Sequence, residues 1–167
     1  MQGYDYSSGV WQFEGYGFVP NGTTGTSIMQ IHRFSGPATV LMLKVYDGQL
    51  KFYTRAVVES NIYDRWMRIN VIHDVDANKL TVFIDGVQKF ETDGNGQGSF
   101  DFKCVVYTQT EPSHYMESRW RNIRVLKKDE WRVWDLSYSS SYPVSVISVR
   151  ARVFVVYDMK SFFSINV

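Results

Sequence analysis

This sequence has little of what marks several large classes of protein. It contains 167 residues but a single cysteine, Cys104, so no intramolecular disulfide can form. It has no apolar run long enough to span a membrane. The first residues show neither the basic segment nor the apolar stretch of a signal peptide. We therefore expect no disulfide framework and no membrane span, and we expect Cys104 to be a buried, inert thiol.

An excess of charge of either sign is also missing. Eighteen Lys and Arg residues against 17 Asp and Glu residues leave a formal net charge of +1. This balance argues against nucleic acid or an anionic membrane as a partner. Three scattered histidines and one cysteine form no recognisable metal set, so we expect no metal site.

No helical period stands out, and short alternating segments separated by turn residues take its place. The predicted strands cover 9–19, 26–34, 38–46, 49–57, 66–75, 79–84, 87–90, 100–109 and 115–126. Asp47-Gly48 is the strongest hairpin signal among the turns. Many short strands at this spacing predict an all-β fold, an antiparallel β-sandwich of jelly-roll type. Aromatic residues make up 16% of the chain, which favours strands, and they serve either sugar stacking or an ordinary sandwich core.

Glycine is confined to the first part of the chain, because all 12 glycines precede Ser99. The glycine-rich segment 93–98 lacks the Lys-Ser/Thr of a phosphate-binding loop, and we expect it to be a mobile connection at the mouth of a cleft. We predict one domain over residues 1–128, followed by a divergent tail over 129–167. The β-prone runs 144–149 and 153–157 are either extra strands or an unpaired appendage.

Two segments far apart in the sequence carry the candidate site. On the first, Gln30 and His32 share one face of a strand; on the second, Lys103, Tyr107 and Gln109 share a face. An amide, an imidazole, a phenol and an ammonium on one surface can hold an anionic sugar and move a proton on it. The plainer interpretation is a surface histidine and a packed tyrosine.

The other two histidines favour no site. His73 and Asp74 are adjacent on one strand and point to opposite faces, so we expect a structural role. His114 lies in a predicted loop and should be exposed. The basic residues between 119 and 128 indicate a solvated strand face.

Several segments resemble a known family. Gln30-Ile31-His32 resembles the Gln-Ile/Val-His motif of the alginate-lyase-type polysaccharide lyases, and 102–109 resembles their Tyr-Phe-Lys-x-Gly-x-Tyr-x-Gln strand. Segments 8–17, 61–66, 71–75 and 115–120 are similar to a plant branch of this fold, the citrate-binding proteins and their glucuronan-lyase-like relatives. The resemblance runs from about Gln2 to Lys128 and implies a concanavalin-like β-jelly roll.

The resemblance also implies a reaction, β-elimination on a uronic acid without a cofactor. Gln30 would bind the carboxylate, His32 is a candidate base, and Tyr107 would be the acid or also the base. A phenol needs a nearby cation to act as a base, and Lys103 supplies one. Lys103 and Gln109 would contact further sugar hydroxyls or carboxylates. The implied partner is an anionic polysaccharide such as alginate or glucuronan, and we expect a monomer from a secretory family of the cell wall or vacuole.

Two alternatives stay open. The plant relatives imply a non-catalytic protein that binds citrate or another small polycarboxylate. The family also has an Arg-Thr/Ser-Glu-x-Arg strand, expected just upstream of Gly3, where this chain begins. We therefore expect a truncated product, which would be inactive if that strand is essential, unless 144–157 fills the gap in the sheet.

Overall fold

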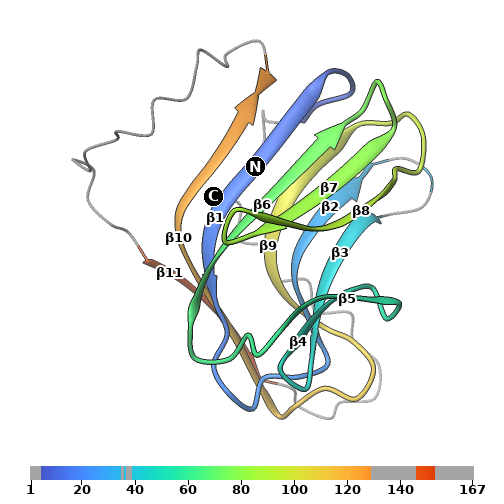
Figure 1. Ribbon diagram of the computed structural model, residues 1–167. Helices are drawn as coiled ribbons and strands as arrows, with labels where there is room; N and C mark the ends of the chain where they lie inside the picture. Colours follow the sequence, from blue (N-terminus) through green and yellow to red (C-terminus); the bar gives the residue numbers. More distant parts are fainter. Residues whose placement is uncertain (1–4, 35, 37–38, 129–145, 153–167) are drawn as a thin grey trace, which may run out of the picture.

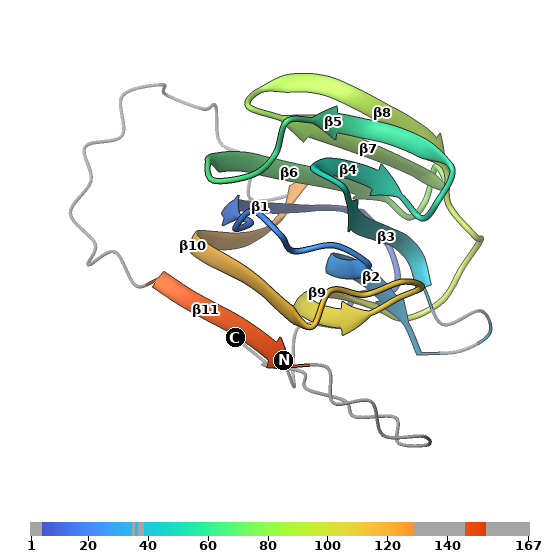
Figure 2. The ribbon, with the colours of Figure 1, turned by 90° about the horizontal axis from the view of Figure 1, so that it is seen from below.

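The computed structural model describes residues 5–34, 36, 39–128 and 146–152, and these form two antiparallel sheets packed face to face (Figures 1 and 2). The strands are β1 (Val10–Phe18), β2 (Thr26–Arg33), β3 (Thr39–Tyr46), β4 (Gln49–Phe52), β5 (Ala56–Ser60), β6 (Trp66–Asp74), β7 (Lys79–Ile84), β8 (Val87–Asp93), β9 (Phe100–Thr108), β10 (Tyr115–Lys127) and β11 (Val146–Arg152). One sheet has the order β11-β10-β1-β6-β7-β8, the other β5-β4-β3-β2-β9. The predicted all-β antiparallel sandwich is confirmed.

One predicted strand is wrong in its length. Residues 49–57 contain the whole of β4 and the first two residues of β5, because the chain reverses at Tyr53, whose φ is +52°. The amide of Arg55 donates to the carbonyl of Phe52 across this turn. Tyr53-Thr54-Arg55 contains none of the usual turn residues, so the sequence carries no signal for it.

Large aromatic side chains fill the space between the sheets. Phe13 of β1 meets Trp120 of β10 edge to face at 5.7 Å between ring centroids, and Phe102 of β9 at 5.8 Å. Tyr6 stacks on Trp11 at 4.8 Å. The Phe13–Phe102 contact crosses from one sheet to the other, whereas Phe13 and Trp120 belong to neighbouring strands of the same sheet. A large share of the aromatic content therefore serves the core.

A buried histidine lies against this aromatic core. His73 is 1% exposed, and the Tyr6 hydroxyl lies 3.0 Å from its Nδ1, where it donates when the ring carries its proton on Nε2. Burial lowers the pKa of His73 to about 4, and the Asp74 carboxylate opposes that shift. This placement agrees with the structural role expected of His73, while His114 is exposed as predicted.

The glycine-rich segment is tied to its surroundings by hydrogen bonds. The Arg33 guanidinium donates to the carbonyl of Asn95 at 2.8 Å and to that of Gln97. The amide of Gly96 donates to the Asn78 side chain at 2.8 Å. Whereas its composition predicted a mobile connection, the segment is fixed to both β2 and the β6–β7 turn.

The later part of the chain supplies an edge strand. β11 pairs antiparallel with β10, so that residues 146–152 extend the six-stranded sheet (Figure 2). The β-prone run 153–157 and residues 129–145 lie outside the described residues. At the edge of the other sheet, β9 pairs with β2 on one side and with Tyr6 through a single bridge at Phe100.

Candidate functional site

The two segments that carry the candidate site lie side by side as β2 and β9. Their antiparallel register pairs Ser27 with Tyr107, Gln30 with Lys103, and His32 with Asp101. Directly opposed residues share a face of the sheet, so these six side chains lie together on the face away from the core. The structure thus brings Gln30, His32, Lys103 and Tyr107 to one surface.

An irregularity in the pairing of β2 and β9 sets this arrangement. The register shifts between Ser27 and Met29, where Ile28 and Met29 are both fully buried although they are adjacent. A bulge of this kind re-aims side chains beside a functional surface. It keeps Ser27 on the outer face with Gln30, whose Nε2 donates to the Ser27 hydroxyl at 3.4 Å.

A carboxylate that our sequence analysis missed lies beside His32. Asp101 is 5% exposed, and its Oδ1 lies 3.3 Å from His32 Nδ1 at ion-pair distance. Its Oδ2 lies 3.7 Å from Lys103 Nζ. The Asp101 carboxylate thus lies between an imidazole and an ammonium on the outer face of the sheet. Strand alternation could have identified Asp101, because Asp101 and Lys103 are two residues apart on one strand and therefore share a face.

Tyr107 and Gln109 lie at the end of β9. The Tyr107 side chain is 39% exposed, and so it is accessible from solvent. Gln109 follows the strand; its backbone amide donates to the Gly25 carbonyl at 2.7 Å and its side chain to the Tyr107 carbonyl at 3.4 Å. Gln109 therefore lies beyond the paired residues, next to Tyr107 but directed at backbone.

The remaining candidate groups offer no second chemistry. Cys104 faces the core opposite Met29, and burial raises the pKa of its thiol, which keeps it protonated. This agrees with the inert thiol expected. Within the described parts of the chain, no three His, Cys, Asp or Glu side chains are grouped so as to hold a metal ion. Over the same residues, no helix has the length and apolarity needed to cross a membrane.

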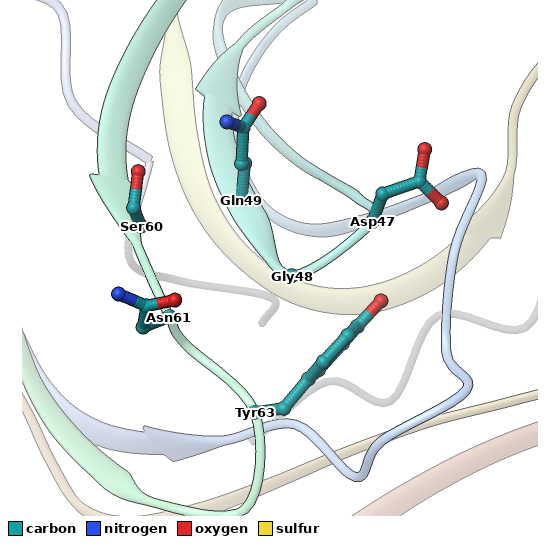
Figure 3. A pocket seen from close by; sticks show the side chains of 6 residues that line it. All are labelled: Asp47, Gly48, Gln49, Ser60, Asn61 and Tyr63. Atoms are coloured by element: carbon teal, nitrogen blue, oxygen red, sulfur yellow. The ribbon is translucent and has the colours of Figure 1, made fainter.

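A separate hollow of about 370 Å³ lies at the turn between β3 and β4 (Figure 3). Its lining is polar and comes from two segments: Asp47, Gly48, Gln49, Ser60, Asn61 and Tyr63. Gln49 of β4 and Ser60 of β5 are directly paired, so both project from one face of the sheet. The Tyr63 ring packs beside Gly48, where an added Cβ would lie 3.2 Å from it.

Comparison with known proteins identifies relatives of this chain. Residues 1–127 match the family model described as alginate lyase. A citrate-binding protein of Hevea brasiliensis is 48% identical over 130 residues, which are 77% of this chain and 55% of that protein. The chain therefore spans about half the length of the curated relative it matches.

Solved structures agree on the fold. The alginate lyase AlgAT5 from polysaccharide lyase family 7 superposes with a TM-score of 0.58 at 18% identity, over 73% of this chain and 62% of that one. The alginate lyase from Corynebacterium sp. superposes with a TM-score of 0.59 at 17% identity, over 73% of this chain and 61% of that one. A variant of the family 7 alginate lyase A1-II′, in complex with substrate, superposes with a TM-score of 0.62 at 12% identity, over 80% of this chain and 67% of that one. At these identities the likeness concerns the fold alone, and it confirms the predicted jelly roll.

Proposed function

This chain belongs to the alginate lyase family, and from that premise we propose that its β2–β9 face binds a uronate-containing polysaccharide and cleaves it by β-elimination. The observation that carries the proposal is the register of the two strands. It places Gln30 and Lys103 opposite each other, with His32 toward one end of the group and Tyr107 toward the other. A carboxylate-binding pair thus lies between two groups that can exchange protons.

Each group has a role in the proposed reaction. The Gln30 amide and the Lys103 ammonium bind the C6 carboxylate of the sugar, which makes the C5 proton more acidic. His32 takes that proton, the C4=C5 double bond forms as the C4–O4 bond breaks, and Tyr107 protonates the leaving O4. The electron pair of the C5–H bond becomes the new double bond, and no cofactor takes part.

Asp101 acts through His32 in this scheme. Its buried carboxylate, with Oδ1 3.3 Å from Nδ1, stabilises by its charge the imidazolium that forms when Nε2 accepts the proton. Sequence comparison gave no role to this residue, and its position beside both His32 and Lys103 is the reason for assigning one.

The test is a lyase assay on alginate, glucuronan and other polyuronates, following the ultraviolet absorbance of the new double bond. We expect turnover with one polymer and a loss of at least about 100-fold in His32→Ala, because general base catalysis contributes that much. The exposed His114→Ala is the matched control and should keep full activity. Folded wild-type protein that yields no absorbance on any polymer would overturn the lyase proposal.

A second candidate function is binding of citrate or a similar polycarboxylate without catalysis. The 48% identity to a protein named for citrate binding favours it, and Gln30, His32 and Lys103 would serve as carboxylate contacts. Calorimetric titration with citrate decides between the two. Citrate binding that Lys103→Gln abolishes, together with no lyase activity, supports this candidate; activity on a polyuronate without citrate binding rejects it. If the protein neither binds citrate nor cleaves a polyuronate, we conclude that this chain is an inactive product.

A further inference from the structure

Two lysines stand directly opposite each other on the same sheet face as the candidate site. The register pairs Lys44 of β3 with Lys51 of β4, and it pairs Lys44 with Ser27 of β2. Their neighbours Leu43, Val45 and Leu50 are fully buried in the core, so alternation directs both lysines to the outer face. The two ammonium groups therefore share the surface that carries Gln30 and His32.

The two lysines continue one row of residues across the sheet. Reading across neighbouring strands, this row contains Tyr107, Ser27, Lys44 and Lys51. Adjacent strands lie about 4.8 Å apart, so β3 and β4 lie roughly 10 and 14 Å from β9. A sugar chain that runs perpendicular to the strands from Tyr107 would pass over both lysines.

Among the described residues, no carboxylate pairs with either of these two lysines. Across residues 5–34 and 39–128, neither ammonium forms an ion pair, and the nearest aromatic partners are Tyr53 at 5.7 Å from Lys44 and Tyr46 at 5.8 Å from Lys51. Burial lowers the pKa of Lys44, which shows that its charge is partly desolvated. Like charges directly opposed on neighbouring strands destabilise a sheet.

The surroundings of the pair suit a sugar as well as an anion. The Lys51 ammonium lies over the Tyr46 ring, and the hydroxyl of this tyrosine is buried without a hydrogen-bond partner among the described residues. The polar hollow at Gln49 and Ser60 begins two residues along β4 from Lys51 (Figure 3). Amide and hydroxyl groups of this kind bind sugar hydroxyls, so the polar surface extends beyond the two charges.

We propose that Lys44 and Lys51 form a second carboxylate-binding subsite, which takes another uronate unit of the polysaccharide bound at His32 and Tyr107. This inference rests on the proposed function and specifies its substrate. The bound chain runs across the strands from β9 toward β4, and a single small carboxylate at the β2–β9 site does not reach the lysines. The site is thereby built for a row of carboxylates at sugar spacing.

The test is calorimetric titration with alginate and glucuronan oligosaccharides, each as a disaccharide and as a hexasaccharide. All proteins carry His32→Ala, so that cleavage of the ligand during the titration is slowed. We expect Lys44→Gln/Lys51→Gln to weaken hexasaccharide binding about tenfold and to leave disaccharide binding unchanged, since two charge-assisted contacts are lost from the longer ligand only. Lys128→Gln, an exposed lysine after β10, is the matched control and should bind as the His32→Ala parent does.

Thermal unfolding without ligand separates a binding role from a structural one. The double variant should unfold at the same temperature as its parent or higher, because it loses a like-charge contact. Equal hexasaccharide affinity in parent and double variant would overturn the second subsite and leave the proposed function intact. Parent protein that binds neither hexasaccharide would overturn both.

Discussion

At the scale of single residues, two histidines have opposite surroundings. His32 is partly accessible and lies 3.3 Å from a carboxylate on the outer face of one sheet. His73 lies in the core against Tyr6 and Phe100, with ring centroids 5.6 and 4.7 Å away. The first belongs to the candidate site, whereas burial lowers the pKa of the second, so that His73 couples folding to pH.

Acid should destabilise the fold through His73. Its folded pKa of about 4 lies below the ordinary histidine value of 6.5, so the unfolded chain binds the extra proton first and the free energy of unfolding falls as pH falls through this window. Between neutral pH and about pH 4, the free energy of unfolding falls by roughly 3 kcal/mol. Urea unfolding of the wild type and of His73→Gln at both pH values measures it.

The His73→Gln variant should show a smaller difference between the two pH values than the wild type. His114→Gln, which removes an exposed histidine, should retain the wild-type difference. The same pH dependence in all three proteins would contradict the assignment to His73.

At the scale of elements, the start of β2 is anchored by a close backbone approach. Gly25 has a φ of +66°, and a Cβ on it would overlap the Glu111 carbonyl oxygen and lie 2.5 Å from Pro112 Cα. Its amide donates to the Val45 carbonyl at 2.9 Å, and its carbonyl accepts from the Gln109 amide. The loop after β9 therefore packs on β2 only because this position has no side chain.

Gly25→Ala should lower the free energy of unfolding by roughly 3 kcal/mol, because backbone strain and a backbone clash act together. Gly22→Ala is the matched control, since its φ of +84° carries the same strain but nothing lies within 4 Å of an added Cβ. We expect a loss of about 1 kcal/mol there. Equal losses in the two variants, measured by chemical denaturation, would show that the clash has no effect.

The sequence predicted strands better than it predicted what lies between them. Alternation and turn residues located the strands, and the same alternation placed Gln30 with His32 and Lys103 with Tyr107. It could not indicate that Lys44 faces Lys51 or that Asp101 faces His32, because the pairing of strands depends on register. The break at Tyr53 was missed since nothing in its composition marks a turn.

At the scale of the whole molecule, the two sheets are joined through aromatic side chains. Phe13 is 1% exposed and contacts rings from β9 and β10, which belong to different sheets. The outer face of the five-stranded sheet carries the lysines, the amide and the imidazole, while its inner face holds this core. The core and the proposed binding surface thus lie on opposite sides of the same strands.

Phe13→Ala should destabilise the protein by about 4 kcal/mol, because it leaves a cavity between the sheets. Phe34→Ala removes the same atoms from a side chain that is 54% exposed, and we expect less than about 1 kcal/mol there. Thermal and chemical unfolding, each followed by tryptophan fluorescence, compare the two. Similar losses in both variants would argue against an inter-sheet role for Phe13.

The single cysteine gives this sandwich an internal reporter. Cys104 lies on the core side of β9, between Lys103 and the two residues that lead to Tyr107, and its thiol is shielded and protonated while the strands stay paired. An alkylating reagent can reach it only when β9 separates from its neighbours. The rate at which Cys104 is alkylated therefore measures how often the strand that carries the candidate site opens. No other thiol in the chain contributes to this rate.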